Sequence, residues 1–461
     1  MTSENGLPGI HLESMAGLSP TRILWVGLRL IVGVYCVVAV LYAIYTPAWQ
    51  VPDEPAHYNY IRHLAEERSF PVLEFGDYDQ QYLSTLTSSG FPPELSIEPL
   101  EYEDHQPPLY YLLSTPVFLA SDGELLPIRL LSVLLGAGVI AFSGLGVWTL
   151  FPGNAPLAIT VAGVVAFVPQ HVAMLAGVNN DSLSEFWIAF GLWLLFLCMT
   201  SNIKRSRRWY LALGIVIGLG LLTKTLAYVL VPVAAIGLFL KSRRENLEWR
   251  QTVRIGLWIF VPAGLLGLLW WGRNLSVYGW PDLLGLQRHN LVVLGQPRTA
   301  EWIEQFGAGE YARRFFQTTF NSFWGQFGWM GVLMDARVYL LLQLLTGAIL
   351  LGGAYVLWLS PALGSPQRDG LWTLFAMAAI TTVLYLGYNV EFVQHQGRYL
   401  FPALTPLATG VAFGLVGWST FLTRQWPGNA RLFVWLPVVI VPFLAALSLF
   451  ALFRFIVPAL G

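Results

Sequence analysis

About eleven runs of mainly apolar residues recur along the chain, and each is close to the length with which a helix crosses a bilayer, roughly 17 to 25 residues. A helix satisfies its own backbone hydrogen bonds, which hydrocarbon cannot do. Only 11% of the residues are charged, whereas soluble proteins carry about 25%. These features predict an all-helical polytopic membrane protein. The predicted spans are 24–48, 125–151, 155–175, 182–200, 208–223, 225–240, 253–272, 337–359, 371–389, 399–421 and 432–456.

The charge balance and the cysteines exclude several other classes of protein. The formal net charge is -1, and there is no basic stripe that would displace counterions from phosphates, so nucleic acid is not an expected partner. The two cysteines, Cys36 and Cys198, both lie in apolar runs, which argues against a disulfide framework or a cysteine metal cluster. Membrane lipids are therefore the expected surroundings of most of the chain.

The distribution of charged residues predicts the orientation of the chain. Basic residues collect in two short loops, which the positive-inside rule places in the cytoplasm. Segment 47–106 instead holds twelve acidic residues and two arginines and is expected outside. The predicted organisation is a cytoplasmic N-terminal tail, 1–23, and a transmembrane domain, 24–461, with external loops 47–124 and 273–336. The basic residues are Lys204, Arg205, Arg207 and Arg208 in one loop and Lys241, Arg243, Arg244 and Arg250 in the other.

Two stretches with few charges, Pro107–Ala120 and Phe315–Met334, would reverse this sidedness if they crossed the membrane. The first is short and interrupted by proline, and the second is rich in Trp, Gln and Asn. We therefore expect both to lie at the outer interface, with Tyr110 and Tyr111 at headgroup depth. Polar residues that are far apart in sequence then gather on the outer side.

The first external motif is Pro-Asp-Glu-Pro-Ala-His at 52–57, directly after the first span. Its Asp53, Glu54 and His57 are suited to act as a general base, as metal ligands or as a cation-binding corner at the bilayer surface. Asp53 is also suited to be the N-cap of a helix over 54–68, with a proline in its first turn. The two interpretations are compatible.

A second motif, Glu-Asp-His-Gln-Pro-Pro at 103–108, ends where the short apolar stretch begins. A Pro-Pro pair breaks one element and starts another. We interpret Glu103 and Asp104 as a solvated acidic face at a helix start. His105, at the junction itself, is the better site candidate.

A third motif is the Asn-Asn-Asp turn at 179–181, before the fourth span. Asp181 is expected to cap that helix. With Asn180 beside it, Asp181 is also a candidate for a second acidic group near Asp53.

Three basic residues are expected at the outer ends of helices. Lys224 interrupts a long apolar stretch, either as a side chain that snorkels to the interface or as a cation that meets a lipid phosphate. Arg273 and Arg398 each stand beside aromatic residues, where an arginine commonly anchors a helix. Arg398 lies in a denser polar cluster with His395 and Tyr399, and it is the preferred anion-binding residue because a guanidinium matches phosphate oxygens bidentately.

Five motifs follow one another along the chain: Pro-Asp-Glu-Pro-Ala-His, His-Gln-Pro-Pro-Leu-Tyr-Tyr, Asn-Asn-Asp, an Arg-Asn and Tyr-Gly segment, and Gln-Gly-Arg-Tyr-Leu-Phe-Pro. In this order, and on one side of the membrane, they resemble the integral-membrane glycosyltransferases of the GT-C fold. The resemblance is greatest to bacterial relatives of the protein O-mannosyltransferases and aminoarabinose transferases, and it covers nearly the whole chain.

The resemblance implies an inverting GT-C hexosyl- or pentosyltransferase on the outer face of a bacterial cell membrane. Its donor is a polyprenyl-phosphate-linked sugar, and its acceptor is a hydroxyl of a glycan, a lipid or a protein. Arg398 and Lys224 match basic positions that hold the donor phosphate, and we add Arg273 to this set.

The resemblance also implies that Asp53, with Glu54 beside it, is the catalytic acidic position. Asp181 occupies the place of the second acidic motif, but Asn-Asn-Asp stands where the family has an acidic pair. No cofactor therefore follows with certainty, and a divalent metal ion stays open. The expected substrate or metal neighbourhood is His57, His105, Asn180, Asp181, His395 and Tyr399.

A transporter or flippase of a lipid-linked glycan is the alternative, with the same residues as binding groups or proton relays. Such folds often have internal repeats and bind their substrate at the membrane midplane. The sequence has no convincing internal repeat, and its ionisable residues gather at one face, which favours the enzyme.

Overall fold

The computed structural model describes residues 19–200 and 207–461, which are helical almost throughout. The predicted all-helical, multi-span class is confirmed. These two ranges contain nine helices long and apolar enough to cross a membrane, or ten if α6 (Ala155–Phe167) and α7 (Pro169–Leu175), bent by 65°, form one span. Residues 1–18 of the expected N-terminal tail and Lys204 and Arg205 of the expected basic loop lie outside the described residues.

Ten of the eleven predicted spans correspond to these helices. The remaining prediction, 208–223, falls on α9 (Arg207–Leu221), which has only 15 residues and packs along α8 and α11. A count of eleven therefore requires this shorter helix to cross as well. The other matched spans contain α1 (Pro20–Tyr45), α5 (Leu125–Leu150), α8 (Asp181–Thr200), α10 (Leu230–Arg244), α11 (Trp249–Tyr278), α15 (Ala336–Leu359), α16 (Ser365–Glu391), α17 (Leu404–Gln425) and α19 (Ile440–Ala451). Adjoining turns lengthen three of them, so the spans of α10, α17 and α19 are Thr225–Arg244, Gly397–Gln425 and Leu436–Leu460.

Shorter elements connect and extend the long helices. Outside the bundle lie α2 (Glu54–Glu67), α3 (Gln80–Ser89), α4 (Leu109–Ala120), α12 (Leu286–Val292), α13 (Thr299–Phe306), α14 (Ala308–Trp324) and the antiparallel strands β1 (Gln326–Phe327) and β2 (Val332–Leu333). Single turns adjoin the spans at η2 (Thr225–Val229), η3 (Gly397–Ala403), η4 (Pro427–Asn429), α18 (Ala430–Phe433), η5 (Leu436–Val439), η6 (Leu452–Ile456) and α20 (Val457–Leu460).

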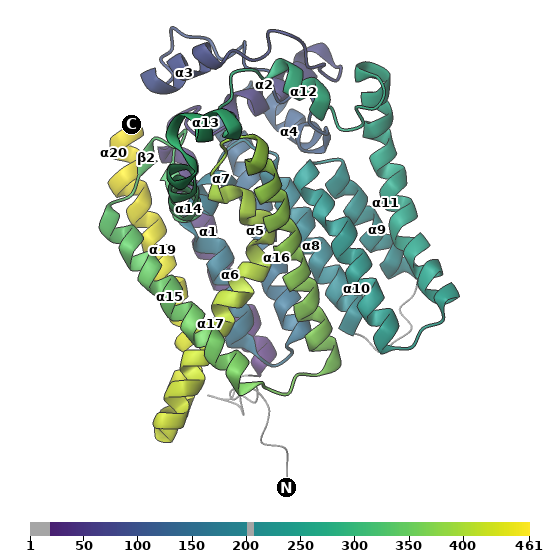
Figure 1. Ribbon diagram of the computed structural model, residues 1–461, viewed down its shortest axis with the longest axis vertical. Helices are drawn as coiled ribbons and strands as arrows, with labels where there is room; N and C mark the ends of the chain where they lie inside the picture. The colour runs from purple at the N-terminus through teal and green to yellow at the C-terminus, as the bar shows by residue number, and fades with distance from the viewer. Residues whose placement is uncertain (1–18, 201–206) are drawn as a thin grey trace.

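The short helices outside the bundle gather at one of its ends (Figure 1). Helices α2, α3, α4, α12 and α13 lie at this end. The start of α1 and the turn between α10 and α11 lie at the opposite end. The acidic segment and the basic turn after α10 are thus separated by the length of the spans, as the charge distribution predicts. Which end faces the cytoplasm remains a prediction.

Small residues allow close helix packing in the bundle. Helices α15 and α17 cross at Gly352, Gly414 and Gly417, and a Cβ at Gly352 would lie 2.0 Å from the carbonyl oxygen of Gly414. Such contact between backbones is how helices associate in a membrane, where no hydrophobic force drives them together.

The break between α6 and α7 comes from Pro169, which has no N–H, and from Val168 before it, which takes an extended conformation. The break frees carbonyl groups of α6. The Nδ1 atom of the buried His171 lies 2.7 Å from one of them, that of Val165, and its Nε2 atom lies 2.6 Å from the carboxylate of Glu185 on α8. These contacts tie α7 to the bundle.

Helix α4 is short, as expected for an element that does not cross, and its tyrosines face the protein interior. Tyr110 and Tyr111 are fully buried. The Tyr110 hydroxyl bonds to Ser132 at 2.9 Å and accepts the backbone N–H of Asn179. A buried tyrosine hydroxyl needs a hydrogen-bond partner, and both hydroxyl groups have partners inside the protein.

Candidate functional site

Asp53 lies between the first span and α2, in a left-handed conformation with φ 68°. The predicted helix 54–68 is present as α2, but the Asp53 side chain does not cap it. One carboxylate oxygen accepts from Arg398 Nη2 at 2.9 Å, and the other accepts from the Tyr102 hydroxyl at 3.1 Å. A strained backbone persists where the surroundings determine it fully, as is common at functional sites.

Glu54 points away from Asp53 into the bundle and is fully buried. Its carboxylate accepts from Arg129 Nη2 at 2.6 Å and Nε at 2.8 Å, and from the backbone N–H groups of Trp49 and Val178 at 3.0 Å. The same guanidinium also donates to carbonyl groups at the end of α1. The predicted catalytic role of Glu54 does not fit this geometry, because every face of its carboxylate is engaged.

The Glu54–Arg129 pair was missed because Arg129 lies in the predicted span 125–151. The signal was present, since a charged residue inside a membrane segment is uncommon and is almost always paired. The pair joins α5 to the loop that carries Asp53.

Asp181 and Lys224 form another acid–cation pair, with the Lys224 ammonium 2.8 Å from the Asp181 carboxylate. This pair lies close to the pair of Asp53 and Arg398. The expectation that Asp181 caps α8 is wrong: the helix begins at Asp181, and the Asn179 side chain accepts its backbone N–H at 2.8 Å. The Asp181 carboxylate is therefore available to Lys224.

Both pairs line one cavity of about 490 Å³, which we name the apolar-walled cavity. Its polar end holds Asp53, Glu103, Asp181, Lys224 and Arg398. The rest of the lining includes His105 and Gln106 and residues of η2, α12, α16 and η3, and its apolar residues include Leu226, Val229, Leu384 and Pro402. The cavity thus joins two cations to apolar surface among the helices.

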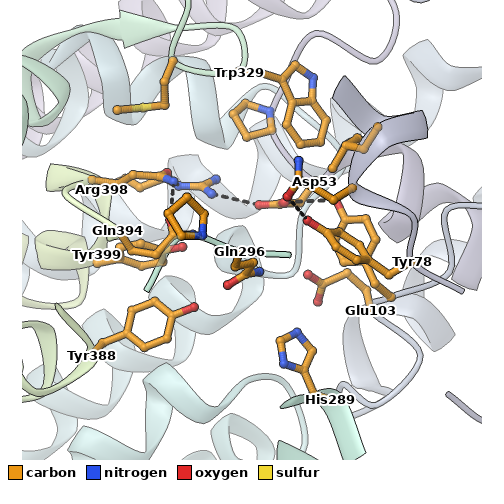
Figure 2. Close-up of a pocket in the computed structure, with 17 residues that line it drawn as sticks. Asp53, Tyr78, Glu103, His289, Gln296, Trp329, Tyr388, Gln394, Arg398 and Tyr399 are labelled. Atoms are coloured by element: carbon orange, nitrogen blue, oxygen red, sulfur yellow. Dashed lines mark hydrogen bonds and ion pairs between the residues drawn. The ribbon is translucent and has the colours of Figure 1, made fainter. Parts of the chain in front are cut away.

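A further cavity of about 260 Å³, which we name the glutamine-lined cavity, adjoins the first (Figure 2). Its own lining includes four glutamines and the rings of Tyr78 and Trp329. The two cavities share residues on either side of the Asp53–Arg398 pair, so this pair stands at their junction. The shared residues are Asp53, Glu103, His289, Tyr388, Arg398 and Tyr399.

The charges around the junction keep three nearby groups in different protonation states. Burial raises the pKa of Asp53, but Arg398 together with the neighbouring His57 and Lys224 outweighs burial, so the pKa lies below its ordinary value. Burial and the Asp53 charge raise the pKa of Glu103 to about 7. Burial lowers the pKa of His57 to about 3, which leaves that ring neutral. Asp53 is therefore ionised at neutral pH, and Glu103 is poised between its two forms.

Two of the other predicted residues also line the cavities. Tyr399 faces both, and His105 faces the apolar-walled cavity with its ring centroid 4.6 Å from that of His289. His57 and Asn180 lie behind the lining, where His57 Nδ1 is 2.8 Å from the Tyr111 hydroxyl and the Asn180 amide donates to that hydroxyl.

Two predicted residues lie away from the site. The Arg273 guanidinium sits over the Trp270 ring and donates to the Tyr278 hydroxyl and to the carbonyl of Pro71, and it lines neither cavity. The predicted phosphate contact of Arg273 therefore does not fit its position. The His395 ring packs edge-to-face against Tyr311 and Phe315 and likewise lies outside the lining.

Several lining residues were missed by sequence reasoning. Glu103 was interpreted as a solvated residue, but it lines both cavities, and its Oε2 atom is buried without a hydrogen-bond partner. His289, Gln296 and Tyr388 come from segments with no distinguishing motif, and only the packing of α12, the following loop and α16 brings them to Asp53. Among these residues, only Glu103 had a signal in the sequence, namely the polar segment 103–106 to which it belongs.

The carboxylates of the site do not fit a divalent metal ion. Asp53 is engaged with Arg398, and Asp181 with Lys224, so each is already neutralised by a cation. Among residues 19–200 and 207–461, no group of three or more His, Cys, Asp or Glu side chains is arranged to hold a metal. No step below is therefore assigned to a metal.

Residues 104–270 match the family described as dolichyl-phosphate-mannose-protein mannosyltransferase. The matched segment begins before α4 and extends into α11, so it contains Glu54's partner Arg129 as well as Asp181 and Lys224. Over this segment, which is just over a third of the chain, the match agrees with the resemblance to the O-mannosyltransferases that the motifs predicted, and Asp53 and Arg398 lie outside it.

Three solved structures are similar to this chain at low identity. The Archaeoglobus fulgidus oligosaccharyltransferase tethered with an acceptor peptide is 12% identical over 91% of this chain, with a TM-score of 0.49. ArnT from Cupriavidus metallidurans bound to undecaprenyl phosphate is 13% identical over 95% of this chain and 74% of its own length, with a TM-score of 0.46. The S. cerevisiae protein O-mannosyltransferase Pmt1-Pmt2 complex bound to the sugar donor is 17% identical over 58% of this chain and 35% of its own length, with a TM-score of 0.36. The chain spans 55% of the length of the oligosaccharyltransferase. A search of curated proteins found no match to the chain.

Proposed function

We propose that this protein transfers a sugar from a polyprenyl-phosphate-linked donor to an acceptor hydroxyl. The observation that carries the proposal is the junction of the two cavities at Asp53 and Arg398. One cavity offers apolar walls and two cations, which suit a lipid phosphate, and the other offers neutral polar groups. The family match supports a glycosyltransferase with a lipid-linked donor in general terms.

Arg398 and Lys224 are the residues that hold the donor phosphate in this proposal. Each now pairs with a carboxylate, at 2.9 Å for Arg398 and Asp53 and at 2.8 Å for Lys224 and Asp181. The donor phosphate is a diester, and its two non-bridging oxygens share one negative charge. These two oxygens compete with the carboxylates for the cations, because arginine binds phosphate bidentately. Donor binding then draws Arg398 from Asp53, and the Asp53 pKa rises toward its ordinary value.

Asp53, once released, is the general base. It accepts the proton of the acceptor hydroxyl while that oxygen attacks the anomeric carbon, and the bond from this carbon to the phosphate oxygen breaks. The sugar configuration inverts, and polyprenyl phosphate leaves with its charge stabilised by Arg398 and Lys224. General base catalysis of this kind contributes about 10²- to 10⁴-fold.

We further propose that the site faces outward across a bacterial cell membrane and that the sugar is a hexose or a pentose. The charge distribution supports the sidedness, because the acidic loop and the basic α10–α11 turn lie at opposite ends of the spans.

The test uses purified protein in lipid nanodiscs with a labelled polyprenyl-phosphate sugar and measures the release of polyprenyl phosphate. We expect Asp53→Asn to bind polyprenyl phosphate but to release it at least 100-fold more slowly from the sugar donor. The exposed Asp122 provides the matched control, because Asp122→Asn makes the same change far from the cavities. Native turnover by Asp53→Asn protein contradicts the proposal. Movement of the intact donor across a vesicle membrane without cleavage supports the transporter instead.

A further inference from the structure

The glutamine-lined cavity differs in chemistry from the apolar-walled cavity beside it, although both reach Asp53. Four of its lining residues are glutamines, and five are aromatic. The glutamines are Gln80, Gln296, Gln394 and Gln396, and the aromatic residues are Tyr78, Tyr102, Trp329, Tyr388 and Tyr399. Figure 2 shows Tyr388 and Tyr399 on one side of the space, Tyr78 on the other and Trp329 at a third edge.

The hydrogen-bonding groups of this cavity call for a ligand that both donates and accepts. The Gln394 carbonyl already accepts from Gln396, and the Gln396 carbonyl accepts from Arg398 Nε, which leaves the Gln394 amide group as a donor. Glu103 offers the opposite, because its buried Oε2 atom has no partner and, when ionised, only accepts. Hydroxyl groups fill both roles, whereas a phosphate or carboxylate cannot donate to Glu103.

The charges of the cavity also disfavour an anionic ligand. Arg398 is its single cationic lining residue and is paired with Asp53, and Glu103 adds a second carboxyl group. Burial lowers the pKa of His289, so that ring adds no positive charge at neutral pH. An anion would therefore meet two carboxyl groups and no spare cation.

We propose that the glutamine-lined cavity is the acceptor site and that it takes an uncharged carbohydrate, one of whose hydroxyl groups reaches Asp53. The inference rests on the proposed function for the role of acceptor, and on the lining residues for the class of ligand. Amide groups from several segments and aromatic faces between them match a sugar ring, which presents hydroxyl groups around its rim and C–H groups on its faces. A peptide with a serine or threonine is the competing acceptor.

The experiment compares three acceptors with the same labelled polyprenyl-phosphate sugar: a neutral octyl disaccharide, its uronic acid analogue and a capped serine–threonine peptide. We expect label to pass to the neutral disaccharide. Transfer to the peptide or to the uronic acid at an equal or greater rate overturns the inference while leaving the proposed glycosyltransferase intact.

Gln296→Leu tests the cavity itself, because this half-buried side chain lines only the glutamine-lined cavity of the two. Loss of one or two neutral hydrogen bonds should raise the KM for the disaccharide about three- to tenfold, with kcat and the binding of polyprenyl phosphate unchanged. The exposed Gln305 on α13 is the matched control, and Gln305→Leu should change nothing. An unaltered KM in Gln296→Leu contradicts the inference.

Binding of the labelled disaccharide in the absence of donor separates failure of the inference from failure of the proposed function. We expect equilibrium dialysis to show binding that Gln296→Leu weakens by the same factor. If the disaccharide binds in this way but no polyprenyl-phosphate sugar is cleaved, the carbohydrate site stands and the proposed reaction fails. Absence of disaccharide binding overturns the carbohydrate site, whatever the donor does.

Discussion

Replacing Arg129 by methionine tests whether a buried ion pair holds the loop that carries Asp53. Arg129 donates five hydrogen bonds, two to Glu54 and one each to the carbonyl groups of Ala43, Thr46 and Pro47. Arg129→Met leaves the Glu54 carboxylate fully buried with only two backbone donors. Removing one partner of a buried pair typically costs about 3 to 5 kcal/mol, and three carbonyl groups at the end of α1 also lose their donor.

We expect the free energy of unfolding of Arg129→Met to fall by about 3 to 5 kcal/mol. A reversible SDS titration measures it, with reaction of the buried Cys198 thiol as the readout of unfolding. Arg62→Met is the matched control, because Arg62 pairs with the exposed Glu98, and such surface pairs contribute about 0 to 1 kcal/mol. Transfer activity should fall as well, since Asp53 is next to Glu54.

The double variant Glu54→Leu/Arg129→Met decides whether the loss comes from the pair. Replacing both charges removes the buried unpaired carboxylate, so the double variant should lose clearly less than the sum of the two single variants. It should not recover fully, because the carbonyl groups at the end of α1 stay without Arg129. A cost below about 1 kcal/mol for Arg129→Met, or effects that add within about 0.5 kcal/mol, would refute the reasoning.

Three further predictions concern the donor, the pH and the orientation. Arg398→Lys should weaken binding of polyprenyl phosphate about tenfold or more in a direct binding assay, because an ammonium cannot replace a bidentate guanidinium; unchanged affinity argues against the phosphate role. The folded state holds a proton on Glu103 up to about pH 7, whereas the ordinary pKa is 4.5, so stability should fall as pH rises from about 4.5 to 7. Melting curves at pH 5 and pH 8 check this, and Glu103→Gln should show a smaller difference between them. A cysteine at the exposed Ser88 should react with an impermeant thiol reagent in intact cells, whereas one at the exposed Ser360 should react only after permeabilisation; the reverse pattern overturns the orientation.

Much of the fold follows from local sequence. A run such as 125–151 is long and apolar enough that a helix is its only stable form in a bilayer, and α5 occupies it almost residue for residue. The helix after Asp53 was likewise predicted within one residue of its end. The residue types also predicted several site residues. Placing an ionisable group beside a membrane span costs free energy, so such a residue is a candidate for a functional role.

The pairing of those residues depended on packing between segments far apart in the chain. Asp53 and Arg398 are 345 positions apart, and nothing in either local sequence specifies their contact at 2.9 Å. Neighbouring acids diverged for the same reason: Glu54 turned to Arg129 inside the bundle, and Asp53 turned to the cavities.

The sequence by itself determined that this chain spans a membrane and that twelve of its 27 acidic residues share one loop between spans, because hydrocarbon excludes charge and unpaired backbone groups regardless of how helices pack. The tertiary structure alone decided which acids and cations pair. It placed the Glu54 carboxylate in a buried ion pair and the Asp53 carboxylate at a cavity. Those outcomes depend on side-chain distances of a few ångströms, and such distances exist only once helices from distant parts of the chain have packed together.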